Sequence, residues 1–460
     1  MRLEFFVPFY GDPGLLRSTV SSVLAQEHPD WSLTVVDDGY PDPAVAEYFA
    51  AGPPYPDRAA RPDGRRPARQ GGGQSGQRGR MRIQPRVLLD ATAIPAQRGG
   101  VGRYVDSLVA ALDADGAALS VVCQHHDADM FAALAPHSRL VPIAEELTSR
   151  PARLTWEQTT LPRLARRLPV DVIHSPHYTM PMTAGMPVVV TLHDATFFTD
   201  RRLHLGLKGR FFRGWTRTSL KLAAVCVVPS KATARELTRT LMVDPSRFVV
   251  AYHGVDADRF HPPTPAEVRA AAEFLGLGDR RWIAFLGTLE PRKNVPALIR
   301  GYVRVAGERC GDADVPALVL AGMAGWDEAV EPALAAVPPG LHVLRPGHLP
   351  IEVLSGFLGG AELVAYPSLG EGFGLPVLEG MACGAPVLTT KRLALPEVGG
   401  DAVAYTGVGA GDIAESLEQL LADPARRAEL AAAGLERSKE FTWAASAEAH
   451  LRAYRQAADG

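Results

Sequence analysis

Two glutamates frame a glycine-rich stretch in the second half of the chain, between Glu371 and Glu379. Glycines let backbone amides approach an anion, and a proline favours a helix start, whose free N–H groups carry partial positive charge. The pattern predicts a pyrophosphate-binding turn, in which Glu371 reaches a sugar hydroxyl and Glu379 accepts from a ribose. The alternative is a tight strand-to-helix turn with two solvated glutamates. The residues between the two glutamates that would line the turn are Gly372, Phe373, Gly374 and Leu375.

A pair of cations follows an expected strand of the same half. Arg292 and Lys293 come shortly after the apolar run 282–286, at the carboxyl edge where α/β sheets bind ligands. Two cations there would oppose the charge of a departing diphosphate, and one charge pair near 4 Å contributes about 4 kcal/mol at an effective dielectric constant of 20, before desolvation. The alternative is that both side chains face solvent.

The first half supplies weaker candidates. Gly99 and Gly100 lie in the segment RGGVGRY, whose glycines would let a phosphate or another ligand group approach the backbone. Its spacing is not GxGxxG, which argues against a dinucleotide cofactor. His193 ends an apolar run and could hydrogen-bond a ligand hydroxyl, unless it is a structural histidine. His174 and His177 end another run without a nearby acidic pair in sequence, so no metal site is predicted.

Strand and helix patterns alternate from residue 81 onward. Short continuous apolar runs indicate parallel sheets that are covered on both faces. We therefore predict an α/β protein of two Rossmann-like, doubly wound domains, 81–260 and 261–440, that face each other across a cleft, and a helix over 441–460 that packs back toward the first domain. The expected strands are 86–90, 119–123, 171–174, 188–192, 224–229, 248–252, 282–286, 317–321, 342–344 and 363–366, and the expected helices include 295–306, capped by Asn294, and 376–383.

The first 80 residues differ in composition. Residues 1–50 predict one strand–helix–strand unit, with strands at 4–8 and 32–36. Residues 51–80 are rich in proline, glycine and arginine, so we expect a disordered linker. A unit of about 50 residues buries too little surface to be stable alone. We expect a chain that starts at Met81 to fold and work as well, unless the fragment packs on the edge of the first domain.

Composition narrows the class of protein. Of the 460 residues, 47% are apolar and 22% are charged, as in soluble globular proteins. A net charge of −3 argues against nucleic acid as a partner. The sequence lacks a signal-like start or a long apolar run, so we expect a cytoplasmic location. The stretch 201–215 interleaves basic and aromatic residues. We expect it to form either a peripheral membrane contact or an ordinary solvated helix. Without CxxC pairs we expect buried free thiols, neither disulfides nor zinc, at Cys123, Cys226, Cys310 and Cys383.

Four segments, in this order, resemble the retaining family-four glycosyltransferases of GT-B fold: GTLEPRKN (287–294), PSLGEGFGLPVLEGMACGAPVL (367–388), LPEVGGDAVAY (395–405) and FTW (441–443). The resemblance covers most of residues 81–460. It implies that Glu371 contacts the donor sugar, Glu379 the ribose and Lys293 a phosphate, and that amides around Phe373 and Gly374 meet phosphate or sugar. It places Gly287 and Thr288 in the donor site. It also implies a histidine facing the cleft at His193, where the side chain could hydrogen-bond the donor sugar or orient the acceptor. Many members have arginine where Thr288 stands, so the second cation is Arg292 or is missing.

The same resemblance implies a function. A sugar would pass, with its anomeric configuration retained, from a nucleoside diphosphate sugar to an acceptor hydroxyl of a glycan, a lipid-linked saccharide or a small molecule, without metal or cofactor. GTLEPRKN is similar to mannosyltransferases that use GDP-mannose, and UDP-sugars stay open. The alternatives are a GT-B-fold sugar-nucleotide epimerase and a noncatalytic sugar-nucleotide-binding protein. VPFYGDPGLLRSTVSSVLAQ and VVDDGYPDP, within residues 1–50, resemble the opening of family-two GT-A glycosyltransferases and predict a truncated, inactive fragment.

Overall fold

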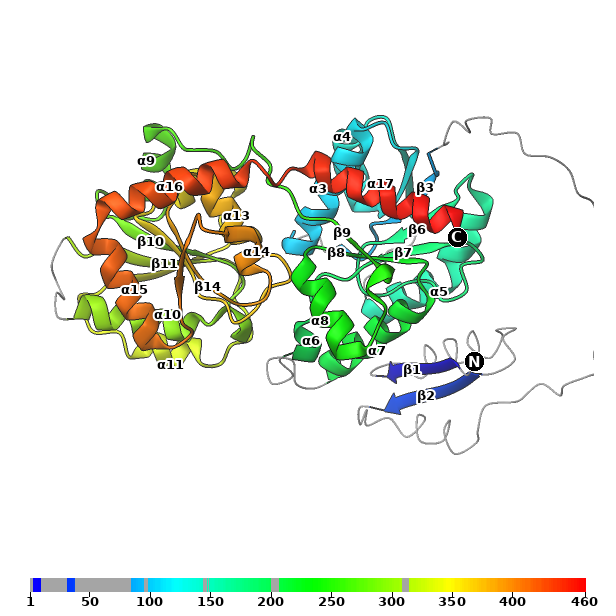
Figure 1. The fold of residues 1–460 in the computed structure, drawn as a ribbon, viewed down its shortest axis with the longest axis horizontal. Helices are drawn as coiled ribbons and strands as arrows, with labels where there is room; N and C mark the ends of the chain where they lie inside the picture. Colours follow the sequence, from blue (N-terminus) through cyan, green and yellow to red (C-terminus); the bar gives the residue numbers. More distant parts are fainter. Residues whose placement is uncertain are drawn as a thin grey trace, which may run out of the picture.

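The structure is a computed structural model that describes residues 3–9, 31–37, 84–94, 98–143, 147, 149–199, 207–307 and 314–460. From residue 84 onward the chain forms two lobes that lie side by side (Figure 1). β1 (Leu3–Phe9) and β2 (Trp31–Asp37) form a separate parallel pair. The expected disordered linker 51–80 and the helix between these two strands lie outside the described residues.

The first lobe is built on a parallel sheet with the strand order β5-β4-β3-β6-β7-β8-β9. Six of its strands coincide with expected ones. β5 was not expected, because arginine and proline interrupt its apolar run, which an edge strand tolerates. The strands are β3 (Val87–Asp90), β4 (Leu119–Gln124), β5 (Arg139–Ile143), β6 (Val172–Ser175), β7 (Val188–Thr191), β8 (Val225–Val228) and β9 (Phe248–Val250).

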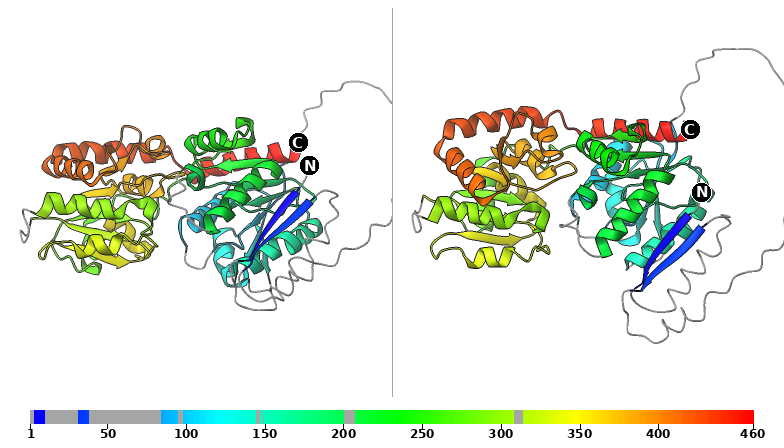
Figure 2. Two further views of the ribbon diagram at one scale, coloured as in Figure 1. Left: turned by 90° about the horizontal axis from the view of Figure 1, so that it is seen from below. Right: turned by 60° about the horizontal axis from the view of Figure 1, so that its bottom comes forward.

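Helices cover both faces of this sheet (Figure 2). Neighbouring residues of β3 point to opposite faces, so Leu89 packs in the cluster that includes α3, whereas Leu88 packs in the cluster that includes α5. In α7, the Phe212 ring stacks on Phe197 at 4.8 Å between centroids, which places this aromatic residue against the lobe. The helical elements are α3 (Gly100–Ala114), η1 (His125–Asp127), α4 (Ala128–Leu134), α5 (Arg150–Arg167), α6 (Thr196–Thr199), α7 (Leu207–Leu222), α8 (Lys231–Leu241) and η3 (Pro245–Arg247).

The second lobe is built on a parallel sheet with the order β12-β11-β10-β13-β14-β15. Its strands are β10 (Trp282–Leu286), β11 (Ala317–Ala321), β12 (Val343–Gly347), β13 (Leu363–Tyr366), β14 (Val387–Thr390) and β15 (Ala404–Thr406). Its helical elements are α9 (Pro265–Phe274), η4 (Pro291–Lys293), α10 (Val295–Ala306), α11 (Val330–Ala335), α12 (Ile351–Gly359), α13 (Leu375–Ala382), α14 (Leu395–Gly399), α15 (Ala410–Ala422) and α16 (Pro424–Ser438).

Asn294 does not cap α10 with its side chain, so that expectation is wrong. The residue has a φ of 59°, in the left-handed region that asparagine tolerates. Its Nδ2 instead donates to the carbonyl oxygens of Val408, at 2.9 Å, and Pro367, at 3.3 Å. Asn294 therefore ties together loops of the second lobe.

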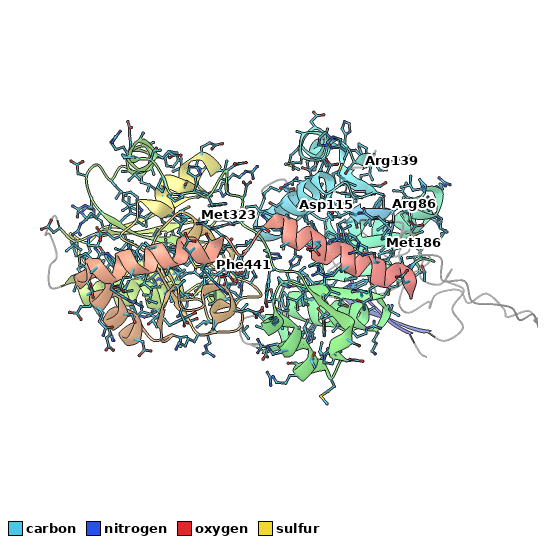
Figure 3. All side chains as sticks on the ribbon, turned by 45° about the horizontal axis from the view of Figure 1, so that its top comes forward. Arg86, Asp115, Arg139, Met186, Met323 and Phe441 are labelled. Atoms are coloured by element: carbon cyan, nitrogen blue, oxygen red, sulfur yellow. The ribbon has the colours of Figure 1, made fainter. Side chains whose placement is uncertain are left out.

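The chain crosses between the lobes twice, and the two crossings touch. Val255 N donates to Phe441 O at 3.1 Å. A Cβ atom on Gly254 would lie 2.2 Å from Trp443 N, so only glycine fits there. Figure 3 shows Phe441 where the lobes meet. After this crossing, α17 (Trp443–Asp459) runs back over the first lobe, where Leu451 joins the apolar cluster of α3.

A chain of buried hydrogen bonds fastens α17 to the first lobe. His450 Nδ1 lies 2.7 Å from Ser446 O and must donate to it, so Nε2 accepts from the Tyr104 hydroxyl at 2.8 Å. Continuing in one direction, Thr191 donates to Tyr104, His174 Nε2 to Thr191, and Tyr454 to His174 Nδ1, each at 2.9 Å. This single assignment satisfies every bond in the chain, and it requires both histidines to be neutral.

We expect the protein to lose stability as pH falls from about 6.5, the ordinary pKa of histidine, to about 4. Burial lowers the pKa of His450 to about 4 and that of His174 well below its usual value. The unfolded chain therefore binds protons that the folded one excludes, and one such shift amounts to roughly 3 kcal/mol. Thermal melting at pH 7 and pH 5 measures the loss. His450→Gln should flatten the pH dependence, whereas the exposed control His348→Gln should leave it unchanged.

Candidate active site

Glu371 lies at the centre of a buried charged cluster at the carboxyl edge of the second sheet. Its Oε1 accepts from Lys293 Nζ and the Ser368 hydroxyl at 2.7 Å and from the Tyr366 hydroxyl at 2.8 Å. Its Oε2 pairs with Arg292. Tyr366 ends β13, Arg292 and Lys293 belong to η4, and the turn before α13 supplies Glu371. We call these five residues the Glu371 cluster.

Of the two cations of this cluster, Lys293 is buried and Arg292 is half-buried, and both are paired. Arg292 also pairs with Glu290 at 2.5 Å, so two carboxylates balance the charges of Arg292 and Lys293. Burial alone would raise the pKa of Glu371, yet the two cations hold it at about 2. Burial and the neighbouring Arg292 lower the pKa of Lys293. The solvent-facing alternative is therefore wrong, because both cations lie in this cluster and pair with Glu371 and Glu290.

The glycine turn lies between the lobes. Gly374 has a φ of 107° and precedes Leu375, the first residue of α13. A Cβ atom on Gly372 would lie 1.8 Å from His193 O of the first lobe, so this glycine allows one lobe to approach the other. Gly372 O accepts from the Ser230 hydroxyl at 2.7 Å. The buried Phe373 ring packs 5.0 Å from the His253 ring.

Glu379 is buried in α13, where the sequence suggested a free carboxylate. Its Oε1 pairs with Arg103 Nη1 of the first lobe at 2.5 Å. The expectation of a free carboxylate is therefore wrong for this oxygen. Its Oε2 is buried and has no hydrogen-bond partner among the described residues. Burial raises the pKa of this carboxyl, and Arg103 opposes the shift only in part. A ligand hydroxyl could bind Oε2.

The glycines of the other candidate loops differ in their surroundings. Gly99 and Gly100 are exposed at the start of α3, and a Cβ atom on either would meet no described atom within 4 Å. Packing within the protein therefore does not require glycine there. Gly287 has a φ of 154°, which favours glycine, and lies against Gly322, where an added Cβ atom would be 2.1 Å from Gly287 O. Thr288 follows it and is half-buried, with its carbonyl accepting from Glu290 N at 2.8 Å.

His193 is a half-buried, neutral ring at the end of β7. Its Nε2 lies 2.6 Å from Pro176 O and must donate to it. Burial lowers the pKa of His193 to about 4, so the ring carries no charge at neutral pH and its Nδ1 is an acceptor. The His193 and Tyr104 rings form a T-shaped pair, with 5.1 Å between their centroids. His193 can therefore accept a hydrogen bond from a hydroxyl.

Comparison with known proteins assigns the chain to a family. Residues 98–259 match Glycosyltransferase Family 4, and residues 270–437 match Glycosyl transferases group 1. The O-antigen chain mannosyltransferase B of Escherichia coli is 30% identical over 286 residues, which are 62% of this chain and 74% of that protein. The chain belongs to the group 1 glycosyltransferases. A glycosyltransferase named D-inositol 3-phosphate glycosyltransferase, from Mycolicibacterium paratuberculosis, is 33% identical over 240 residues, which are 50% of this chain and 52% of that relative.

Solved structures share the fold of this glycosyltransferase. HepE of Anabaena, in complex with UDP and glucose, has a TM-score of 0.63 at 16% identity, with coverage of 79% of this chain and 97% of that one. Sucrose-phosphate synthase from Thermosynechococcus elongatus has a TM-score of 0.63 at 22% identity, with coverage of 81% and 99%. The predicted GT-B arrangement of two Rossmann-like domains is confirmed.

Two charged side chains of this glycosyltransferase, Arg103 and Glu397, were not recognised in the sequence as contacts between the lobes. Arg103 lies in the RGGVGRY segment, which drew attention only through its glycines. Glu397 lies in the LPEVGG motif, and its carboxylate accepts from Lys231 N at 2.8 Å and Ala232 N at 2.9 Å, at the start of α8 in the other lobe. A carboxylate is favourable at a helix N-terminus. Tyr252 adds a third bond to Glu397 at 2.6 Å. Both side chains thus connect the lobes.

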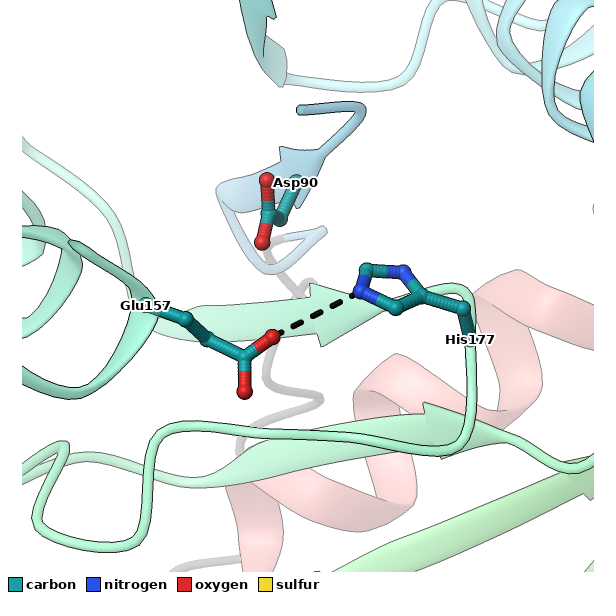
Figure 4. A group of neighbouring side chains, drawn as sticks. All are labelled: Asp90, Glu157 and His177. Atoms are coloured by element: carbon teal, nitrogen blue, oxygen red, sulfur yellow. Dashed lines mark ion pairs between the residues drawn. The ribbon is translucent and has the colours of Figure 1, made fainter. Parts of the chain in front are cut away.

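His177 corrects the view that no acidic pair accompanies the histidines. Asp90 and Glu157 lie next to it, and the potential ligand atoms of the three residues are within 4.8 Å of one another (Figure 4). The pair comes from β3 and α5, far apart in sequence, so spacing gave no signal. His174 instead belongs to the hydrogen bonds that hold α17.

Three further expectations concern the cysteines, membrane-spanning helices and the basic and aromatic stretch. The three described cysteines, Cys123, Cys226 and Cys383, are buried and free, and Cys310 lies outside the described residues. Throughout the described part of the chain, every helix is too short or too polar to cross a membrane. Residues 201–206 of the basic and aromatic stretch are not described.

Proposed function

We propose that this glycosyltransferase moves a sugar, with retention of anomeric configuration, from a nucleoside diphosphate sugar to a hydroxyl of a glycan, lipid-linked saccharide or small-molecule acceptor. The observation that carries the proposal is the Glu371 cluster at the glycine turn. There the Glu371 carboxylate, with its pKa held at about 2, stays ionised at neutral pH and can accept a hydrogen bond from a sugar hydroxyl. The open Oε2 of Glu379, one turn into α13, fits a ribose hydroxyl.

The proposed transfer needs no protein nucleophile. The bond from the anomeric carbon to the donor phosphate oxygen breaks, and the acceptor oxygen bonds to the same face of that carbon. The acceptor proton passes to the departing phosphate. Preorganised cations and helix dipoles stabilise the charge that grows on the leaving diphosphate. Lys293 has three N–H donors, of which Glu371 and Tyr366 engage two.

For the donor we favour GDP-mannose. The GTLEPRKN segment and the Escherichia coli relative, which is named a mannosyltransferase, support this choice. The HepE complexes with UDP-glucose leave UDP-sugars as the competing class, but at 17% identity that likeness bears on the fold alone.

A donor screen tests the proposal. Incubation with GDP-mannose, UDP-glucose and UDP-N-acetylglucosamine, with and without a pool of saccharide acceptors, should release nucleoside diphosphate fastest from GDP-mannose. NMR of the product should show the donor's anomeric configuration. An inverted linkage would contradict retention. Isomerisation or hydrolysis that no acceptor accelerates would favour the epimerase alternative, and preference for a UDP-sugar would overturn the choice of mannose.

A further inference from the structure

A second polar cluster lies at the carboxyl edge of the first sheet. Asp90 ends β3, His177 follows β6, and Glu157 and Arg153 lie in α5. Asp90 and Glu157 are fully buried, and the side chains of Arg153 and His177 are only 13% and 16% exposed. Figure 4 shows that Asp90, Glu157 and His177 point toward one another from three different elements.

Three polar atoms of this cluster are buried without a hydrogen-bond partner in the described part of the chain: Asp90 Oδ2, Arg153 Nη1 and His177 Nε2. Asp90 Oδ2 and Arg153 Nη1 are 3.7 Å apart, which is too long for a hydrogen bond. Native proteins rarely leave buried polar atoms unpaired, because each has lost its hydration. The cluster therefore holds an acceptor, Asp90 Oδ2, and a donor, Arg153 Nη1, side by side, and no described protein group forms a hydrogen bond with either.

The charges of the cluster select against two kinds of ligand. A divalent cation between the carboxylates would lie beside the Arg153 guanidinium, whose Nη2 already pairs with Glu157 Oε2 at 2.6 Å. That same oxygen also accepts from the Thr179 hydroxyl at 2.6 Å and lies 3.5 Å from His177 Nε2, an ion pair drawn as a dashed line in Figure 4. An anion would meet two carboxylates and one guanidinium. A hydroxyl group carries no charge and can donate to one neighbour while accepting from another.

The cluster is connected, through neighbouring residues, to the glycine turn of the second lobe. β3 and β6 are neighbours in the sheet, and ligands of α/β sheets bind at the carboxyl ends of such strands. The residue before His177 is Pro176, whose carbonyl accepts from His193. The His193 carbonyl lies against Gly372 in the turn that leads to α13. One short loop therefore connects the cluster to the contact between the lobes.

We infer that this cluster binds two neighbouring hydroxyl groups of the sugar acceptor, an inference that rests on the proposed transferase function. One hydroxyl donates to Asp90 Oδ2, and the other accepts from Arg153 Nη1. His177 Nε2 supplies the third contact. These residues position the acceptor and select for a pair of vicinal hydroxyls, and they take no part in breaking the donor bond.

The test uses the full chain and three methyl glycosides, the α-mannoside, α-glucoside and α-galactoside, as probes in saturation-transfer NMR. At least one of them should bind the parent protein. Asp90→Asn keeps the shape of the side chain and should weaken that binding roughly tenfold, because a hydrogen bond to a charged group is lost. His177→Gln is a second variant in case Asp90→Asn folds poorly. The matched control, Asp115→Asn on the exposed end of α3, should bind like the parent.

Donor binding separates this inference from the proposed function. Calorimetry with GDP and UDP on the same samples should give parental affinities for Asp90→Asn and His177→Gln. If neither nucleotide binds the parent, the proposed function fails. If a nucleotide binds but no glycoside does, or if both variants bind glycoside like the parent, the inference fails alone. Binding of Mn²⁺ by the parent, and its loss in Asp90→Asn, would establish a metal site and overturn the hydroxyl assignment.

Discussion

Lys293→Met should lower turnover by about 10²- to 10³-fold, the usual effect of removing one preorganised donor from a site of growing negative charge. Methionine keeps the length of the buried side chain and removes the ammonium. Glu371 would keep its contacts with Arg292, Tyr366 and Ser368, so the carboxylate remains paired and the fold should survive. Initial rates with saturating donor, together with a melting curve, measure the two effects separately.

The matched control for this substitution is Lys439→Met, because Lys439 forms an exposed ion pair with Glu436. Exposed pairs contribute little to stability, about 0–1 kcal/mol, and this one lies in no proposed site, so rate and melting temperature should match the parent. A Lys293→Met enzyme with full turnover and a normal melting curve would remove Lys293 from the mechanism. A melting temperature that falls as steeply as the rate would show a structural role only.

Most strands could be predicted from the sequence because they are buried on both faces of a parallel sheet and are therefore continuous apolar runs. Runs such as 282–286 and 317–321 are wholly apolar, and they became neighbouring strands of one parallel sheet. Strands were missed where exposed or polar residues interrupt the apolar run. β5 is an edge strand with exposed residues. β14 was not expected because it carries Thr389 and Thr390, whose buried hydroxyls donate to carbonyls of Tyr366 and Ser368.

The site was predictable only within single segments. The turn from Glu371 to Glu379 is local, so glycine, proline and glutamate were informative in sequence. Contacts between the lobes are not local. Arg103 meets Glu379 across 276 positions of chain, and Gly372 accommodates a carbonyl from another domain. No periodicity or spacing encodes such pairs, because they depend on how the two finished domains dock.

Glu379→Ala should weaken donor binding by about 10- to 100-fold, because a hydrogen bond to a charged group contributes about 1.5–3 kcal/mol. The unpartnered Oε2 is the expected contact for a ribose hydroxyl. Since the ribose is present in the nucleoside diphosphate alone, calorimetry with GDP and UDP should show the loss without any turnover. Glu371→Gln should leave that affinity unchanged, because Glu371 is expected to contact the sugar that these ligands lack.

Arg103→Ala distinguishes the two oxygens of Glu379. Arg103 occupies Oε1, so if the ribose binds Oε2, removing the guanidinium should weaken nucleotide binding less than removing the carboxylate does. The exposed Glu418→Ala, in α15 of the same lobe, is the matched control and should bind nucleotide like the parent. Parental GDP and UDP affinities in Glu379→Ala would place the ribose elsewhere. The Arg103–Glu379 pair would then be a contact between the lobes with no part in donor recognition.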